Sequence, residues 1–123
     1  MSDMVPLMQY VVQQLKTVHN RVYLEQAPDD PVFPYVVYQM PTSNEMENRE
    51  DFSIEVNIWG NSLDTLEIEQ LTSNIDRRLN RLSHYDNGFQ TILYRINRMM
   101  IPDPEPSIRR RQLRYQAQTY MKG

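Results

Sequence analysis

The side chains best suited to acid–base or metal chemistry in this sequence are two histidines and two groups of carboxylates. His19 and His84 each lie at the expected end of a helix, where an imidazole commonly meets unsatisfied carbonyl groups. Carboxylates cluster at Asp29-Asp30 and again within the polar segment 42–51. A general acid or a hard-cation site needs carboxylates that converge in one pocket, whereas neighbours on a polar loop point separately into water. The sequence therefore predicts no catalytic residue.

The residues that other common sites require are missing as well. There is no cysteine, which excludes disulfides, thiolate nucleophiles and cysteine-containing metal sites. No two histidines stand four residues apart, and the three glycines, Gly60, Gly88 and Gly123, are too scattered to form a phosphate-binding loop. We expect no metal, no nucleotide or other cofactor, and no enzymatic activity.

Two segments of opposite charge stand out instead, and both are candidate subunit or tube interfaces. The acidic segment contains Glu45, Glu47, Arg49, Glu50 and Asp51. The arginine run contains Arg109, Arg110, Arg111 and Arg114. Successive side chains on an extended chain alternate between faces, so these arginines cannot all serve one flat surface. Since guanidinium groups bind carboxylates as well as phosphates, we rank contact with another subunit first, solvation second and nucleic acid third.

Charge is divided unevenly along the whole chain. Residues 1–70 carry twelve acidic and three basic side chains, for a formal charge of −9, whereas residues 71–123 carry four acidic and ten basic ones, for +6. If the halves fold onto different surfaces, the acidic surface of one molecule can bind the basic surface of the next in a head-to-tail contact that closes into a ring. The alternative is a solvated surface on which the charges intermix after folding.

The length and composition are those of one domain. At 123 residues and 40% hydrophobic, the chain can bury about two-thirds of its unfolded surface around one core, so we expect a single domain over residues 1–123. The absence of cysteine fits a reducing compartment, and there is neither a signal-peptide pattern nor a run of about 18 apolar residues. We expect a soluble intracellular product with no membrane segment.

Apolar residues recur at three- and four-residue spacing in two segments, which predicts helices over residues 4–18 and about 62–82. Ser2 or Asp3 can cap the first helix, and Asn61 or Ser62 the second. The second helix carries acidic residues early and arginines late, an order that suits the helix dipole.

A high density of aromatic and β-branched residues predicts a strand over residues 35–40, and alternating apolar residues predict strands over residues 52–58, 89–97 and 113–121. Prolines predict an irregular loop over residues 28–34, the segment 42–51 reads as a protruding hairpin or a mobile loop, and Asp86-Asn87-Gly88 reads as a turn. Trp59 is either an interface anchor or a core-edge residue that covers the second helix. This order predicts an α+β fold: a mostly antiparallel, four- to five-stranded sheet with two helices packed on one face.

Several of these blocks together resemble the tail-terminator, or tail-completion, proteins of long-tailed bacteriophages, from about residue 5 to residue 121. They are the initial helix, Val22-Tyr23, the strand Phe33-Pro34-Tyr35-Val36-Val37-Tyr38, the strand Glu55-Val56-Asn57-Ile58-Trp59-Gly60 before a long helix, and Arg109-Arg110 before the last strand. The resemblance implies a virion protein, assembled in the host cytoplasm, that forms a hexameric ring on the head-proximal end of the tail tube. Such a ring stops tube polymerisation and joins the tail to the head.

The same resemblance implies the partners: further copies of the chain, the tail tube protein, a head-completion or connector protein, and genomic DNA that passes through the lumen without sequence-specific binding. It carries over no catalytic residue. Three alternatives remain open: a head-completion or connector protein of the neck, a nucleic-acid-binding module that uses Arg109–Arg111, and a small enzyme acting through a carboxylate.

Overall fold

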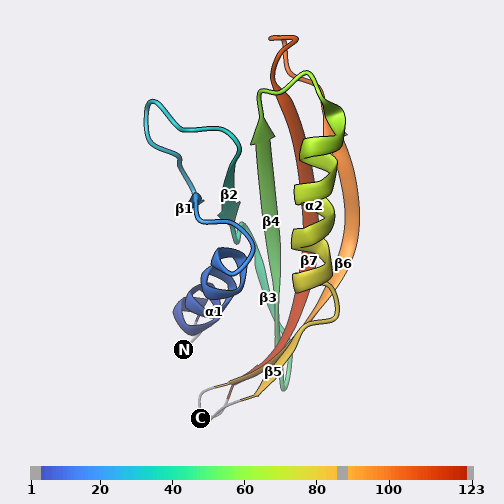
Figure 1. Cartoon of the computed structure of the whole chain (residues 1–123). Helices are drawn as coiled ribbons and strands as arrows, with labels where there is room; N and C mark the ends of the chain where they lie inside the picture. Colours follow the sequence, from blue (N-terminus) through green and yellow to red (C-terminus); the bar gives the residue numbers. More distant parts are fainter. Residues whose placement is uncertain (1–3, 86–88, 122–123) are drawn as a thin grey trace.

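The computed structural model describes residues 4–85 and 89–121, which form two helices and seven strands (Figure 1). Their order is α1 (Met4–Lys16), β1 (Val22–Leu24), β2 (Tyr35–Gln39), β3 (Ser43–Glu45), β4 (Glu50–Gly60), α2 (Thr65–Leu79), β5 (Ser83–Tyr85), β6 (Phe89–Ile101) and β7 (Arg109–Met121). The Asp86-Asn87-Gly88 turn and the Ser2 or Asp3 cap that the sequence predicted lie outside the described residues.

All seven strands belong to one mixed sheet. Its order is β1-β2-β4-β7-β6-β5. Strand β3 pairs with the first three residues of β4, Glu50–Phe52, on the same side of β4 as β2. The expected α+β class is correct, but the sheet has seven strands instead of four or five, and β1 runs parallel to β2. The sequence did not predict β1 or β5 as strands, and gave β3 only as one half of a possible hairpin. Each has three residues, too few to display an alternating pattern.

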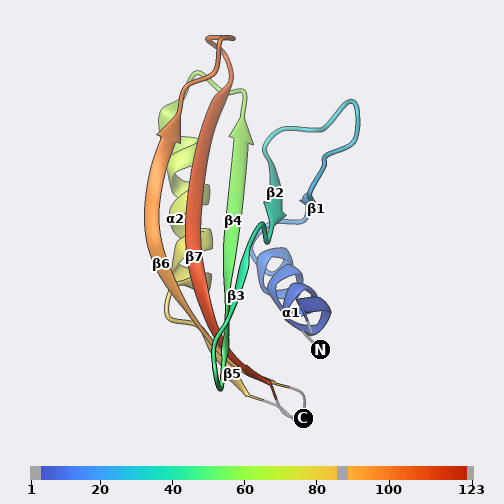
Figure 2. The same cartoon turned by 180° about the vertical axis from the view of Figure 1, so that it is seen from behind.

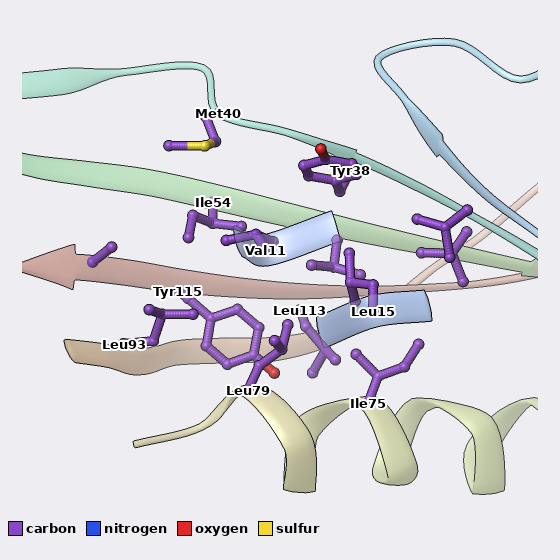
Figure 3. Close-up of a cluster of buried hydrophobic side chains, with 14 of the residues drawn as sticks. Val11, Leu15, Tyr38, Met40, Ile54, Ile75, Leu79, Leu93, Leu113 and Tyr115 are labelled. Carbon is purple, nitrogen blue, oxygen red and sulfur yellow. The ribbon is translucent and has the colours of Figure 1, made fainter. Parts of the chain in front are cut away.

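Both helices pack on one face of the sheet, as expected, and we call this side the helix face (Figure 1). Helix α1 buries Leu7, Val11 and Leu15 in the same apolar cluster to which α2 contributes Ile68, Ile75 and Leu79 (Figure 3). The sheet contributes the predicted inward residues of its two central strands, namely Phe52, Ile54, Val56 and Ile58 from β4 and Leu113, Tyr115 and Ala117 from β7. The alternation of both strands is therefore confirmed.

Helix α1 starts at Met4 as predicted, but its end and both ends of α2 differ from the prediction. Helix α1 ends at Lys16, and α2 begins at Thr65, where the side chain of Asp64 accepts a 2.9 Å hydrogen bond from the Leu66 amide. Asp64 is therefore the cap, not Asn61 or Ser62. Because α2 starts later than expected, Leu63 lies outside the helix, and both Leu63 and Leu66 are exposed.

The predicted strand 89–97 continues to Ile101, with a β-bulge between Arg95 and Asn97. Ile92, Tyr94 and Ile96 lie away from the helices, while the core receives Phe89 and Leu93 from the same strand. The segment 42–51 forms a hairpin: β3 pairs with the start of β4, and the Met46 amide donates to the Arg49 carbonyl. The hairpin alternative is therefore correct.

Candidate assembly surfaces

The face of the sheet opposite the helices is here called the open face (Figure 2), and β4 and β7 present polar side chains on it. Cross-strand hydrogen bonds run across it from β4 to β7. Asn57 accepts hydrogen bonds from Arg110 at 2.9 Å and from Gln112 at 3.0 Å. Further along, Glu55 accepts from Gln39 and lies 3.9 Å from Arg114. The charged side chains of Glu55 and Arg110 thus have polar partners within the chain itself.

Arg110 also contacts an aromatic stack on the open face. Its guanidinium carbon lies 4.5 Å from the centroid of Trp59, and the Trp59 ring stacks on Tyr35 at 5.3 Å between centroids. The cation lies over the negative face of the indole, which is favourable. Trp59 therefore does not cover α2, which lies on the other face, and its core-edge interpretation was wrong.

The helix face holds Arg95 and Arg98 of β6 and Arg111 of β7. Arg111 is buried, and its Nε lies 3.3 Å from Glu69 of α2, which also accepts a 2.8 Å hydrogen bond from Arg98. The Arg98 hydrogen bond is the main reason why the pKa of Glu69 is lowered. The arginine run is thus divided between the two faces, as alternation required, and three of its four members have a partner side chain inside the chain.

The acidic segment is divided in a similar way. Asp51 is buried on the open face, where its carboxylate pairs with Arg49 at 3.1 Å and accepts a hydrogen bond from Gln116. Glu50 is buried on the helix face. Glu45 and Glu47 are exposed and make no ion pair with any described residue. The structure therefore leaves these two carboxylates available to a second molecule.

The acidic segment and the first three arginines of the run, Arg109–Arg111, lie at opposite ends of the sheet, while Arg114 lies near its middle (Figure 1). Glu50 starts β4 and Gly60, which pairs with Arg109, ends it, so about 34 Å separates the two levels at 3.4 Å per residue. Charges this far apart in one chain cannot pair with each other. Contact between the two segments requires two molecules.

A surface that the sequence did not reveal is the outer edge of β6. Strand β5 pairs only with residues 90–92, and no described residue forms a backbone hydrogen bond to the outer side of residues 96–101, here called the open edge. Ile96, Met99 and Met100 are exposed there, Met100 by 66%. Lysine and proline are two of the residues with which natural edge strands block pairing, and residues 96–101 contain neither, although they include Arg98 and follow a bulge. The absence of lysine and proline from residues 96–101 is the feature of the sequence that could have indicated an open edge.

The histidines hold structural positions. The His19 ring nitrogen lies 2.7 Å from the Pro34 carbonyl oxygen, and His84 stacks on Tyr10 at 4.1 Å. Within residues 4–85 and 89–121, no three metal-ligating side chains gather into a site. None of the helices in the described part of the chain is long and apolar enough to span a bilayer.

A sheet with cross-strand polar contacts, unpaired edges and separated charged ends is typical of a protein that works by contact with other proteins. Comparison with known families assigns the chain within that class. The family described as "Tail completion protein gp17" matches residues 9–120, and the chain belongs to this family. It is a structural protein of the bacteriophage virion, located in the tail, and the suspected relation to tail-completion proteins is confirmed.

Comparison with solved structures agrees on the fold. One chain of the "Virion of native gene transfer agent (GTA) particle" matches with a TM-score of 0.69, over 89% of this chain and 91% of that chain. The two are 13% identical, so this likeness shows the fold alone. No protein of curated function matches this sequence.

Proposed function

We propose that this protein, acting as one domain over residues 1–123, forms a hexameric ring at the head-proximal end of the tail tube. The ring stops polymerisation of the tube and joins the tail to the head. Its partners are further copies of the chain, the tail tube protein and a head-completion or connector protein. Genomic DNA passes through the lumen without sequence-specific contact. The ring has no catalytic role and holds no cofactor.

Membership of the tail-completion family supports this proposal, and so does the fold shared with a chain of a phage-like particle. The structural observation that supports a ring is the separation of opposite charges between the two ends of the sheet. Glu45 and Glu47 lie at one end without an ion pair among the described residues, and Arg109 and Arg110 lie at the other. Unlike ends that attract each other make a heterologous contact, and such contacts form rings when the rotation closes.

Reversing the exposed acidic charges tests the proposal. Glu45→Lys with Glu47→Lys is compared with Asp29→Lys and Asp30→Lys, which makes the same change in net charge on an exposed loop. Electron microscopy and light scattering should show rings for the wild type and the control, and fewer rings for the first variant. Assembly should weaken from low salt to above about 0.1 M salt, where charges more than about 10 Å apart are screened.

The result in the virion is decisive. Particles that lack this protein should carry tails of irregular length that are not attached to heads. Tails of normal length that remain joined to capsids would contradict the proposed function.

A further inference from the structure

Two of the exposed strand edges lie on opposite sides of the sheet, and their backbone groups complement each other. One is the open edge of β6, residues 96–101. The other is the outer side of β3, Ser43–Glu45, which is fully exposed and forms no backbone hydrogen bond to a described residue other than those of β4. A ring made from one kind of subunit brings two such unlike edges together.

The hydrogen-bond pattern identifies the free groups on β6. On the outer side of β6, the Leu93 amide donates to the Leu82 carbonyl, and the Leu93 carbonyl accepts from the Arg81 amide. The Arg95 amide also points outward and donates to the Asn80 side chain. Bonding direction alternates along a strand, and the pairing with β7 skips Ile96 at the bulge. The outward amides and carbonyls of the open edge therefore belong to Arg98 and Met100.

The same reasoning applies to β3. The Thr42 carbonyl accepts from the Ser53 amide, and the Met46 amide donates to the Arg49 carbonyl, so even-numbered residues bond inward to β4. The outward groups of β3 belong to Ser43 and Glu45. Both edges thus offer two residues, spaced by two, with free amides and carbonyls.

We propose that β3 of one subunit pairs with the open edge of β6 in the next subunit, so that the sheets join around the ring. Within one chain β3 is antiparallel to β4, while β4 and β6 are both antiparallel to β7. Cyclic symmetry keeps strand direction relative to the ring axis, so the new pairing is antiparallel. Ser43 then lies opposite Met100, and Glu45 opposite Arg98.

The side chains agree with this register. Ser43 and Glu45 pair with Phe52 and Glu50, so they lie on the helix face. Arg98 contacts Glu69 of α2 and lies on the same face. The register therefore places the unpaired carboxylate of Glu45 beside a guanidinium of the neighbour, an opposite-charge cross-strand pair.

The surroundings of the open edge are basic as well. Among the described residues, two carboxylates pair with the three arginines here: Asp76 pairs with Arg95, and Glu69 pairs with both Arg98 and Arg111. Arg81 is exposed next to this edge and has no ion pair among the described residues. A shift of two residues in one direction would bring Pro102 opposite Ser43, and proline has no amide to donate. A shift in the other direction would bring Ile96, which the β7 pairing skips at the bulge, opposite Glu45.

The two edges do not lie at the same level of the sheet. The centre of β3 is level with Asp51 of β4, whereas Met99 is level, through Gln112, with Asn57. This offset is six residues along β4, about 20 Å. From β3 to β6 each subunit contributes four neighbouring strands, β3, β4, β7 and β6, which together are about 19 Å wide. An offset of about 20 Å over this width tilts the strands by about 45° from the ring axis, close to the strand tilt of closed barrels.

This inference rests on the proposed ring and adds the contact that closes it. Because the chain has no cysteine, pairs of introduced cysteines can test it. The variant Ser43→Cys with Met100→Cys places one thiol on each edge, where opposed Cα atoms would be about 5.5 Å apart, within disulfide range. Asn44→Cys with Met100→Cys is the matched control, since residue 44 pairs with Asp51 and points to the open face.

After mild oxidation we expect the first variant to give a ladder of covalent oligomers that ends at the size of the ring, and the control to stay uncrosslinked. Rings in electron micrographs without crosslinks in the first variant would overturn the strand pairing and leave the proposed function standing. Equal crosslinking of both variants would also overturn the pairing. A wild-type protein that remains monomeric at all concentrations would overturn both.

A second variant tests the backbone contact without a thiol. Met100→Pro removes one outward amide and leaves the pairing with β7, whereas Met100→Val keeps the amide. We expect the protein concentration for half-assembly to rise about fivefold for each hydrogen bond lost per contact in the proline variant relative to the valine variant. Equal assembly of two equally stable variants would overturn the pairing.

Discussion

Tyr115 of β7 donates a 2.7 Å hydrogen bond from its hydroxyl to the carboxylate of Asp76 on α2. The second oxygen of that carboxylate accepts a 2.7 Å hydrogen bond from Arg95 of β6. Burial of the phenol, followed by its contact with Asp76, raises the pKa of Tyr115 well above its usual range. One carboxylate thus ties α2 to two neighbouring strands, beside the open edge.

We predict that Tyr115→Phe destabilises the fold by about 1.5–3 kcal/mol, the usual loss for a hydrogen bond to a charged group. The aromatic side chain stays packed, because phenylalanine has nearly the same volume as tyrosine and only the hydroxyl is lost. Urea unfolding followed by circular dichroism measures the change. Tyr94→Phe, on an exposed position of β6, is the control and should lose less than about 0.5 kcal/mol.

Val56 is fully buried at the centre of β4, and this gives the sharpest test of the sheet. We predict that Val56→Asp costs about 4 kcal/mol or more, because it places an unpaired carboxylate on the helix face. Most of the stability of a domain this size would be lost. Val5→Asp, at an exposed position in α1, should melt close to the wild type. A Val56→Asp protein with wild-type melting would contradict the assignment of the two faces.

The sequence was sufficient for elements whose pattern is long enough to repeat. Phe52, Ile54, Val56 and Ile58 alternate over a whole strand, and the stripe of α2 extends over several turns. The start of α2 was misplaced because Leu63 and Leu66 continue the apolar spacing although they face solvent. The spacing of apolar residues in the sequence does not show which turns of a helix pack against the sheet.

The candidate site was harder to predict because its contacts are distant in sequence. Nothing near Arg111 or Arg98 indicates that Glu69, on a different element, binds both. The pairing of Arg114 with Glu55 likewise depends on the β4–β7 register. Charge composition identified the two charged segments, but only the three-dimensional arrangement divides each segment between two faces.

Acid should weaken the link between α2 and the strands. The pKa of Glu69 is lowered from its ordinary value of 4.5, so the stability it contributes is present above that pH and is lost as pH falls through the lowered pKa. We predict that the difference in unfolding free energy between wild type and Glu69→Gln is constant near neutral pH and shrinks below about pH 4.5. Denaturant titrations at several pH values measure it. A difference that is independent of pH would show that the carboxylate charge does not stabilise the fold.

Two neighbouring arginines should respond differently to the same substitution. Arg111 is buried against Glu69, so Arg111→Glu places two carboxylates together and should destabilise the fold by about 3–5 kcal/mol, as loss of a buried ion-pair partner does. The one hydrogen bond of the Arg109 side chain to a described residue is a long one, 3.4 Å, to the Leu63 carbonyl. Arg109→Glu should therefore leave the melting temperature nearly unchanged and impair assembly. Thermal melting and light scattering on both variants separate the two effects. If Arg109→Glu assembled like the wild type, the basic end of the sheet would not be part of the subunit contact.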